Sequence, residues 1–227
     1  MIPALLLLTA VSAAPIVTTS CGTYAGVTKT IQNAVVDSFL GIRFANAPVG
    51  QLRWAPPQPP TCDPGAYFAA TTQAAPCIQD SQDPVPGDED CLFLNIARSS
   101  NLTHASLAPV LVFWHGGDLT IGATSWHDVA IAAGAFAEQF GSVVLVFPAY
   151  RLNVLGWLAT DDLAAEQGGH AGNYGTLDQL EALRWVQVRY SVTHPVDALL
   201  LAHHGSLSRA CTCNFSNITA QHRCLWR

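Results

Sequence analysis

The chain has 227 residues, half of them hydrophobic and only 11% charged, which excludes a disordered protein and allows one or two domains with a buried core. The formal net charge of −6, with no block of Lys or Arg, argues against nucleic acid as a partner. The 7 cysteines favour an oxidising compartment.

The first residues predict a secretory signal peptide. Residues 1–10 are apolar but too short to span a bilayer, and Val11, Ser12 and Ala13 fit a small-x-small cleavage pattern. We therefore expect residues 1–13 to be a signal peptide cleaved after Ala13, with a buried first strand as the alternative. No other stretch has the roughly 18 consecutive apolar residues of a transmembrane helix. The sequence thus predicts a secreted protein without a transmembrane segment.

Glycosylation sequons agree with export. Asn101 is followed by Leu102 and Thr103, which makes it an N-glycosylation acceptor, and two further sequons begin at Asn214 and Asn217. We expect Asn101 to carry a glycan.

Strands and helices follow from the spacing of apolar residues. We expect strands over 21–30, 34–44, 92–97, 109–114 and 142–147, and helices over 125–141 and 176–187. Ser125 is the expected N-cap of the first helix. Thr176 and Gln179 form a capping box for the second helix. Its expected inward stripe is Leu177, Leu180, Leu183 and Val186. Strand, helix, strand over 109–147 favours a parallel βαβ unit.

The central stretch is 109–122, PVLVFWHGGDLTIG. An apolar strand buried on both faces runs directly into a turn of His115, Gly116, Gly117 and Asp118. Two adjacent glycines let the backbone bend and leave its N–H groups uncovered, and such groups can stabilise a developing oxyanion. The alternative is a turn with no chemical role.

The residues from 77 to 91 resemble a polar surface loop closed by Cys77 and Cys91. Closing a loop of that size contributes about 3 kcal/mol in the chain-entropy account. The alternative is two free thiols. Cys21 and Cys62 lie in the same segment, and their pairing stays open.

Five stretches resemble, in order, the N-terminal part of the type-B carboxylesterases, the family of cholinesterases and several fungal lipases. They read FLGIRFANAPVGQLRW, EDCLFLNI, PVLVFWHGG, VVLVFPAYRLNVLGWL and GNYGTLDQLEALRWVQ. The resemblance implies an α/β fold of the α/β-hydrolase type, here an incomplete N-terminal portion, residues 14–187, of a mostly parallel sheet with flanking helices. It also implies hydrolysis of small-molecule or lipid esters without a cofactor.

The resemblance assigns roles residue by residue. Gly116, Gly117 and Asp118 resemble the oxyanion loop, with the N–H groups of Gly117 and Asp118 as donors. Asp118 departs from the usual glycine or alanine, and we expect its side chain to point outward. The implied structural pairs are the disulfide Cys77–Cys91 and the ion pairs Arg53–Glu89 and Arg151–Asp178.

The catalytic triad is absent. This fold needs a serine in a G-x-S-x-G turn, a histidine base and an acid, and no G-x-S-x-G occurs here. Residues 203–208, HHGSLS, have the residue types without the spacing. In the family, the acid and the histidine lie in a C-terminal half. We therefore expect a truncated carboxylic-ester hydrolase, inactive as written. The alternative is a non-catalytic secreted binding or adhesion protein of the same fold.

The tail, residues 188–227, diverges from the family. We interpret 188–215 as an insertion such as a retained intron, because 216–220 fits the family's continuation, and we infer a frame change after Ala220. Residues 198–202, ALLLA, are expected to be solvated or loosely packed because His203 and His204 follow them, with a short strand or helix as the alternative. The spacing of Cys211, Cys213, His222 and Cys224 matches no known zinc finger, so we expect no metal site.

Overall fold

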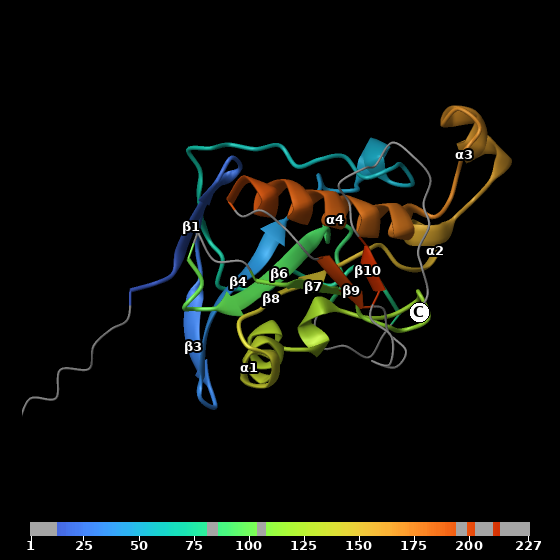
Figure 1. Cartoon of the computed structure of the whole chain (residues 1–227). Coiled ribbons are helices and arrows are strands. Elements are labelled where there is room, and N and C mark those ends of the chain that lie inside the picture. Colours follow the sequence, from blue (N-terminus) through green and yellow to red (C-terminus); the bar gives the residue numbers. More distant parts are fainter. Residues whose placement is uncertain (1–12, 81–85, 104–107, 194–198, 203–210, 214–227) are drawn as a thin grey trace, which may run out of the picture.

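The computed structural model describes residues 13–80, 86–103, 108–193, 199–202 and 211–213 (Figure 1). The expected signal peptide therefore lies outside the described residues, apart from its last residue. Seven strands form one sheet in the order β10-β9-β7-β8-β6-β4-β3, and three form a small sheet in the order β1-β2-β5. Within the described ranges, the helices are too short or too polar to cross a lipid bilayer.

The strands are Ile16–Thr19 (β1), Gly22–Ala25 (β2), Val27–Ile31 (β3), Ala34–Arg43 (β4), Tyr67–Ala69 (β5), Phe93–Ser99 (β6), Val110–Phe113 (β7), Val144–Pro148 (β8), Leu199–Ala202 (β9) and Cys211–Cys213 (β10). The α-helices are Val129–Phe140 (α1), Asn153–Trp157 (α2), Asp161–Glu166 (α3) and Tyr174–Thr193 (α4). Two short 3₁₀ helices span Gly50–Leu52 (η1) and Thr124–Trp126 (η2).

The large sheet is mixed, which corrects the expectation of a mostly parallel sheet for the described part of the chain. Parallel pairing is confined to β8 with β7 and β7 with β9, and the other neighbouring strands are antiparallel. The reason lies in the connections. Only a tight turn joins β3 to β4, and such a turn forces antiparallel pairing, whereas the crossover through α1 brings β8 alongside β7 in parallel.

The central strands β7 and β8 are buried on both faces, as their unbroken apolar sequences predict. Val110 and Val112 of β7 pack in one hydrophobic cluster, while Leu111 between them packs in a second. In β8, Val146 joins the first cluster and Leu145 the second. Successive side chains of a strand point to opposite faces, so the sheet separates two cores.

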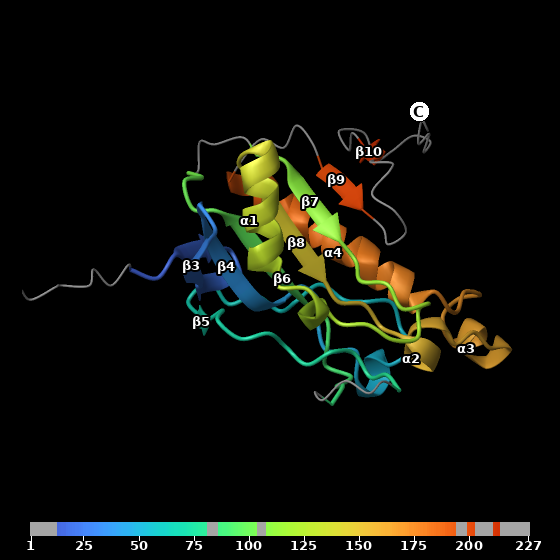
Figure 2. The same cartoon turned by 90° about the horizontal axis from the view of Figure 1, so that it is seen from below.

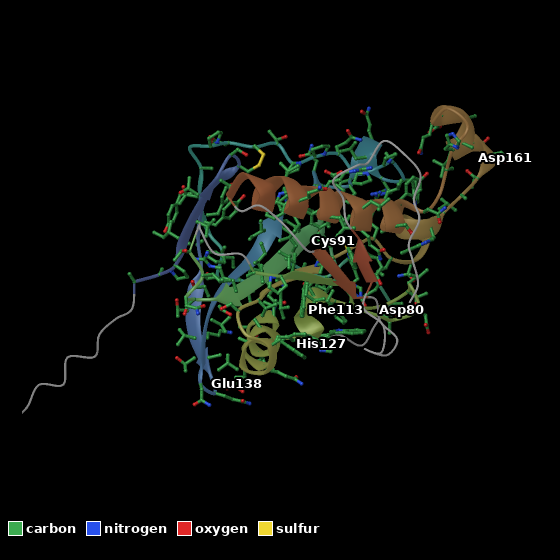
Figure 3. The ribbon with its side chains drawn as sticks, in the orientation of Figure 1. Asp80, Cys91, Phe113, His127, Glu138 and Asp161 are labelled. Atoms are coloured by element: carbon green, nitrogen blue, oxygen red, sulfur yellow. A yellow bond between two sulfur atoms is a disulfide. The ribbon has the colours of Figure 1, made fainter. Side chains whose placement is uncertain are left out.

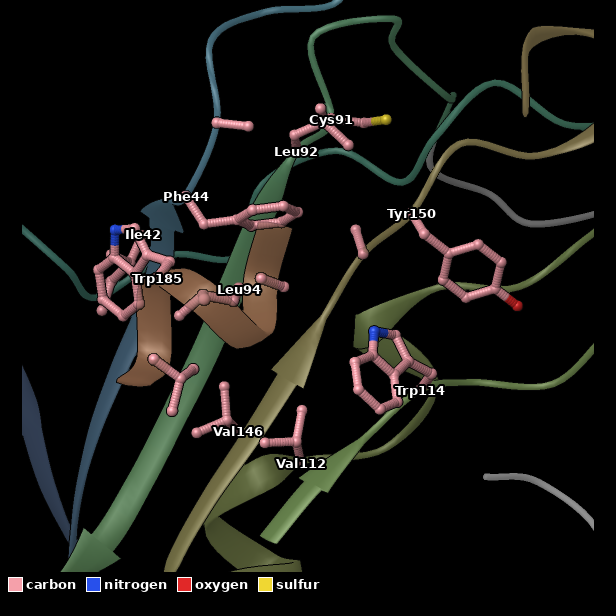
Figure 4. Packing of buried hydrophobic residues seen from close by; sticks show 14 of the residues in the cluster. Ile42, Phe44, Cys91, Leu92, Leu94, Val112, Trp114, Val146, Tyr150 and Trp185 are labelled. Carbon is pink, nitrogen blue, oxygen red and sulfur yellow. The ribbon is translucent and has the colours of Figure 1, made fainter. Parts of the chain in front are cut away.

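One helix covers each face of the large sheet. In Figures 1 and 2, α1 and α4 lie on opposite sides of β6, β7 and β8. Val129 and Ala133 of α1 pack in one cluster, and Ala182 and Trp185 of α4 pack in the other. In Figure 4, Trp185 lies beside Ile42 of β4. The fold is therefore an α/β sandwich of helix, sheet and helix.

Helix α1 begins later than expected. Residues 124–126 form η2, so Ser125 is not the N-cap. The cap is Asp128, whose carboxylate accepts hydrogen bonds from the N–H groups of Ala130 and Ile131 at 2.8 and 3.4 Å. Both residue types cap helices well, and the extra 3₁₀ turn moves the helix start by three residues.

Helix α4 begins earlier than the capping box predicts, at Tyr174, so Thr176 lies inside its first turn. The rotation of α4 about its axis also differs from the predicted one, which placed Leu180 toward the core. Leu180 is 42% exposed, whereas Asp178 is fully buried. Residues four and eight positions after Asp178 share its face, and these are Ala182 and Val186. The buried carboxylate thus sets which side of the helix faces the sheet.

The backbone of part of the tail pairs with the large sheet, within the segment 198–202 that we expected to be solvated or loosely packed. Residues 199–202 form β9, whose backbone pairs in parallel with β7 from Val110 to Phe113. Strand β10 pairs with β9 on its other side.

Asp128 provides a test of the helix start. Asp128→Ala removes the cap, and we expect the free energy of unfolding at pH 7 to fall by about 1 kcal/mol. Burial alone raises the pKa of Asp128, but the hydrogen bonds from Ala130, Lys29 and Ile131 outweigh it, so this pKa is lowered. A carboxylate with a lowered pKa stabilises the fold above its unfolded pKa of about 4, and this stabilisation is lost as the pH falls through the folded pKa.

Urea unfolding at pH 7 and pH 3 measures both effects. The cost of Asp128→Ala should shrink at pH 3. Glu166→Ala, at the exposed end of α3, is the control and should change little at either pH. A cost that is the same at both pH values would contradict the role of the ionised cap.

Candidate oxyanion loop

The glycine turn, defined as residues 115–122, follows directly from β7. Gly117, Asp118 and Leu119 have φ values of 118°, 53° and 63°. At Gly117 a Cβ atom would overlap the carbonyl group of Ile121, so only glycine fits there. The backbone therefore reverses sharply over residues 117–119, four to six residues after the end of β7.

His115 anchors the start of the turn. It is only 4% exposed, and its ring stacks on Tyr150 with 4.5 Å between centroids. Its Nδ1 lies 3.0 Å from the Gly116 carbonyl, which can only accept, so Nδ1 carries the proton. Burial lowers the pKa of His115, which keeps the ring neutral at pH 7.

Tyr150 fixes the same residue from the backbone side. Its hydroxyl donates to the His115 carbonyl at 2.9 Å. In Figure 4 this hydroxyl points out of the hydrophobic cluster to which the ring belongs. Burial raises the pKa of Tyr150 to about 12, so the hydroxyl stays a donor throughout the neutral range. The end of β7 and the turn are thus held by one side chain, from the second residue after β8.

The tip of the turn is closed by its own backbone and by Asn153. The Gly117 carbonyl accepts from the N–H groups of Thr120 and Ile121, both at 3.0 Å. Asn153 donates its backbone N–H to the Leu119 carbonyl at 2.9 Å and its side-chain amide to the Thr120 carbonyl at 2.7 Å. These hydrogen bonds fix the conformation of the turn.

The predicted oxyanion donors remain available. Among the described residues, the N–H groups of Gly117 and Asp118 donate to no other protein group. The Asp118 side chain is exposed, in agreement with the expected outward orientation. A fixed turn with unsatisfied N–H groups is suited to binding a developing negative charge on oxygen.

Close to the turn, the rings of Phe113 and His127, which Figure 3 labels, meet edge to face with 5.9 Å between their centroids, and His127 is exposed. Among the described residues, no group of three or more His, Cys, Asp or Glu side chains gathers that could hold a metal ion. Of the tail residues considered as metal ligands, His222 and Cys224 lie outside those residues.

Two disulfides brace the N-terminal part. Cys77 is bonded to Cys91, both nearly fully buried, as the resemblance implies. Cys21 is bonded to Cys62, the pairing that the sequence left open. The first disulfide closes the segment that contacts the glycine turn.

Near this disulfide, Arg53 donates two hydrogen bonds of 2.6 Å to Glu89, the first of the implied ion pairs. A second bidentate pair, Arg43 with Asp90 at 2.7 Å, was not expected from the sequence. Its only sequence signal is the acidic run that also contains Glu89. Both pairs are partly exposed, so each contributes little to stability.

The second implied ion pair is buried. Arg151, directly after Tyr150, donates from Nε and Nη2 to the two oxygens of Asp178 at 2.8 Å each, and from its backbone N–H at 3.0 Å. The side chains are 3% and 0% exposed. Burial raises the pKa of Asp178, while the hydrogen bonds from Arg151 act in the opposite direction.

The sequence reasoning missed three residues that hold the turn, namely Tyr150, Asn153 and Gln79. Tyr150 and Asn153 lie within the quoted stretch VVLVFPAYRLNVLGWL, but nothing in their spacing shows which backbone groups they contact. The candidate serine segment, 203–208, lies outside the described residues.

The buried pair gives a stability prediction. Arg151→Met leaves the Asp178 carboxylate buried without its cation, and we expect the free energy of unfolding to fall by about 3–5 kcal/mol. The double variant Arg151→Met, Asp178→Leu should recover most of this loss, because it removes both charges. Chemical unfolding measures the two variants. Arg53→Met, in the exposed pair, is the control and should change stability far less. A double variant no more stable than Arg151→Met would contradict the argument.

Solved esterase structures share this architecture. The structure of Aspergillus niger EstA superimposes with a TM-score of 0.66 at 32% identity, over 77% of this chain and 32% of that one. A thermophilic PNB esterase superimposes with a TM-score of 0.70 at 29% identity, over 84% of this chain and 38% of that one. The fold is therefore a partial α/β-hydrolase fold.

Curated relatives give the same result from sequence. Human (Homo sapiens) cocaine esterase is 41% identical over 192 residues, which cover 78% of this chain and 32% of the relative. Mouse (Mus musculus) pyrethroid hydrolase Ces2a is 41% identical over 165 residues, covering 67% and 28%. The chain thus spans about a third of the length of the relatives it matches. Since residues 13–190 also match the family described as "Carboxylesterase family", the chain belongs to the type-B carboxylesterases.

Proposed function

We propose that the whole protein hydrolyses carboxylic esters and that this chain supplies its oxyanion loop. The observation that carries the proposal is the glycine turn, in which the N–H groups of Gly117 and Asp118 are free of protein partners among the described residues. Membership of the carboxylesterase family supports the same chemistry. Small-molecule or lipid esters are the substrates that this chemistry implies, and no cofactor takes part.

The turn would act on the tetrahedral intermediate of acyl transfer. When a serine oxygen adds to the ester carbonyl, the carbonyl oxygen becomes negative, and the two N–H groups donate to it. Removing one such donor typically lowers kcat by about 10²–10³. The neutral His115 and the protonated Tyr150 hold these donors in place before the substrate arrives.

As written, the chain lacks the nucleophile. Its sequence contains no G-x-S-x-G turn, so the oxyanion loop has no serine ester to stabilise. We propose that residues 188–215 are an insertion and that the reading frame changes after Ala220. The match to the family, which extends to residue 190, supports a break close to this position.

The messenger tests this part of the proposal. We expect transcripts that lack codons 188–215 and continue in frame into a G-x-S-x-G sequence. Sequencing across codons 180–230 decides the point. Transcripts that always contain codons 188–215 would overturn it.

Ester turnover tests the function directly. The chain as written should release no p-nitrophenol from p-nitrophenyl butyrate above the buffer rate and should not react with a fluorophosphonate probe, because both need an activated serine. A protein encoded by a transcript that lacks codons 188–215 and continues in frame into a G-x-S-x-G sequence should do both. A commercial carboxylesterase serves as the positive control.

In the protein that contains the G-x-S-x-G sequence, Gly117→Ala should lower kcat by about 100-fold, because the added methyl group displaces the loop. Ester hydrolysis by the chain as written, or no ester hydrolysis by the protein that contains the G-x-S-x-G sequence, would contradict the proposal.

We also propose that the protein is secreted and glycosylated at Asn101, which is exposed in the turn after β6. Expressed in secretory cells, the protein should reach the medium without residues 1–13. Treatment with a glycan-cleaving amidase should lower the mass of the secreted protein, and in Asn101→Gln this decrease should be smaller by the mass of one glycan. Asn33→Gln, at an exposed asparagine outside any sequon, should leave the shift unchanged. An unglycosylated product retained in the cell would contradict this proposal.

A further inference from the structure

A side chain from the disulfide-closed segment clamps the C-terminal end of the glycine turn. Gln79 lies two residues after Cys77 and is half-buried. Its Nε2 donates to the Gly122 carbonyl at 2.8 Å, and its Oε1 accepts from the Gly122 N–H at 2.7 Å. The Nε2 group also donates to the Cys77 carbonyl at 3.1 Å. One amide therefore satisfies both backbone groups of Gly122 and is itself tied to the disulfide.

Gly122 also packs against His115, the residue at the start of the glycine turn. Its φ is 136°, and a Cβ atom there would overlap the His115 ring and the Gly116 carbonyl. The backbone of Gly122 therefore packs directly against the residue that precedes the two central glycines. A shift of Gly122 would move His115 against Tyr150, and the donors at Gly117 and Asp118 lie between these fixed points.

A second amide joins the same two segments. The Asn153 side chain donates to the Thr120 carbonyl at 2.7 Å and to the Ile78 carbonyl at 3.4 Å. Gln79 and Asn153 thus connect residues 77–79 to residues 119–122 by contacts that reach far along the sequence. These contacts explain why a disulfide in one segment can stabilise a turn in the other.

We propose that Gln79 is a positioning residue for the oxyanion loop, and that the Cys77–Cys91 disulfide holds Gln79 in place. The catalytic meaning of this proposal rests on the proposed function, whereas the clamp itself does not. An oxyanion donor must be held within about 0.5 Å of its productive position, so a clamp on the loop affects transition-state binding more than substrate binding.

Amide hydrogen exchange on the full chain tests the clamp. In Gln79→Ala, we expect the Gly122 amide to exchange about tenfold faster than in the unaltered protein, because one hydrogen bond to a backbone N–H is lost. Amides of β8 should keep their protection. Gln58→Ala removes an exposed amide that contacts only the Pro56 carbonyl, and it should change neither rate.

The conservative variant adds a signature that a general loss of structure would not give. At pH 7, Gln79→Glu keeps an oxygen that can accept from the Gly122 N–H, but its second carboxylate oxygen replaces the donor that faced the carbonyls of Gly122 and Cys77. Repulsion between that oxygen and the two carbonyls should move the side chain away from Gly122 and expose the Gly122 N–H. Protonation at pH 4 restores one donor. After correction for intrinsic exchange rates, Gly122 protection should therefore be restored at pH 4 in Gln79→Glu and not in Gln79→Ala.

The disulfides provide a matched comparison. Replacing Cys77 and Cys91 with serine should speed exchange at Gly122, whereas replacing Cys21 and Cys62 should leave it unchanged. Unchanged Gly122 exchange in Gln79→Ala would overturn the proposal, as would an equal loss of protection in β8. If Gln79→Ala does not fold, the pH dependence of Gln79→Glu decides, and its absence overturns the clamp.

Failure of the clamp is distinct from failure of the proposed function. If the protein from the transcript without codons 188–215 hydrolyses esters, Gln79→Ala should lower its kcat with little change in KM, and an unchanged kcat would overturn the positioning role. If that protein hydrolyses no ester while Gly122 behaves as expected, the clamp stands and the proposed function fails.

Discussion

The buried ion pair between Arg151 and Asp178 determines how the two layers of this fold meet. Arg151 is the third residue after β8, and Asp178 lies in the second turn of α4, so the pair joins the end of the central sheet to the helix that covers it. A charge without its partner would be costly there, and only one rotation of α4 brings the carboxylate to the guanidinium. The preceding residue, Tyr150, reaches the glycine turn instead. Two adjacent side chains thus connect the helix and the turn to the same strand.

The positions of the central strands could be predicted from the sequence because a strand buried on both faces has an unbroken run of apolar residues. The stretch 142–147 predicts a strand, and β8 spans Val144–Pro148. The rotation of α4 could not be predicted in this way, because the capping box at Thr176 is a local signal and the contact of Asp178 with Arg151 is not. The same holds for β9, because nothing in its sequence shows that its backbone pairs with β7. The family resemblance supplied pairs such as Arg53 with Glu89, but the contacts of Tyr150 and Gln79 became visible only in the folded chain.

The chemistry of an ester hydrolase divides between a nucleophile and an electrostatic site, and the two have different structural needs. The glycine turn depends on Tyr150, Asn153 and Gln79, all of which belong to this chain. It is therefore complete without the residues that would attack the substrate. A preorganised site of this kind gains its effect from rigidity, since its dipoles need not reorient during the reaction. This explains why the turn is recognisable in a sequence with no nucleophile elbow.

The pairing of β9 with β7 has a consequence for how this chain could be extended. Strand β7 is hydrogen-bonded to β8 on one side and to β9 on the other, so neither of its edges is open. In an open sheet, growth occurs at the free edge of the outermost strand. Here residues 199–202 occupy the place next to the strand that leads into the glycine turn. Any other strand can reach that place only by exchange, in which four residues of the tail are released as the newcomer pairs.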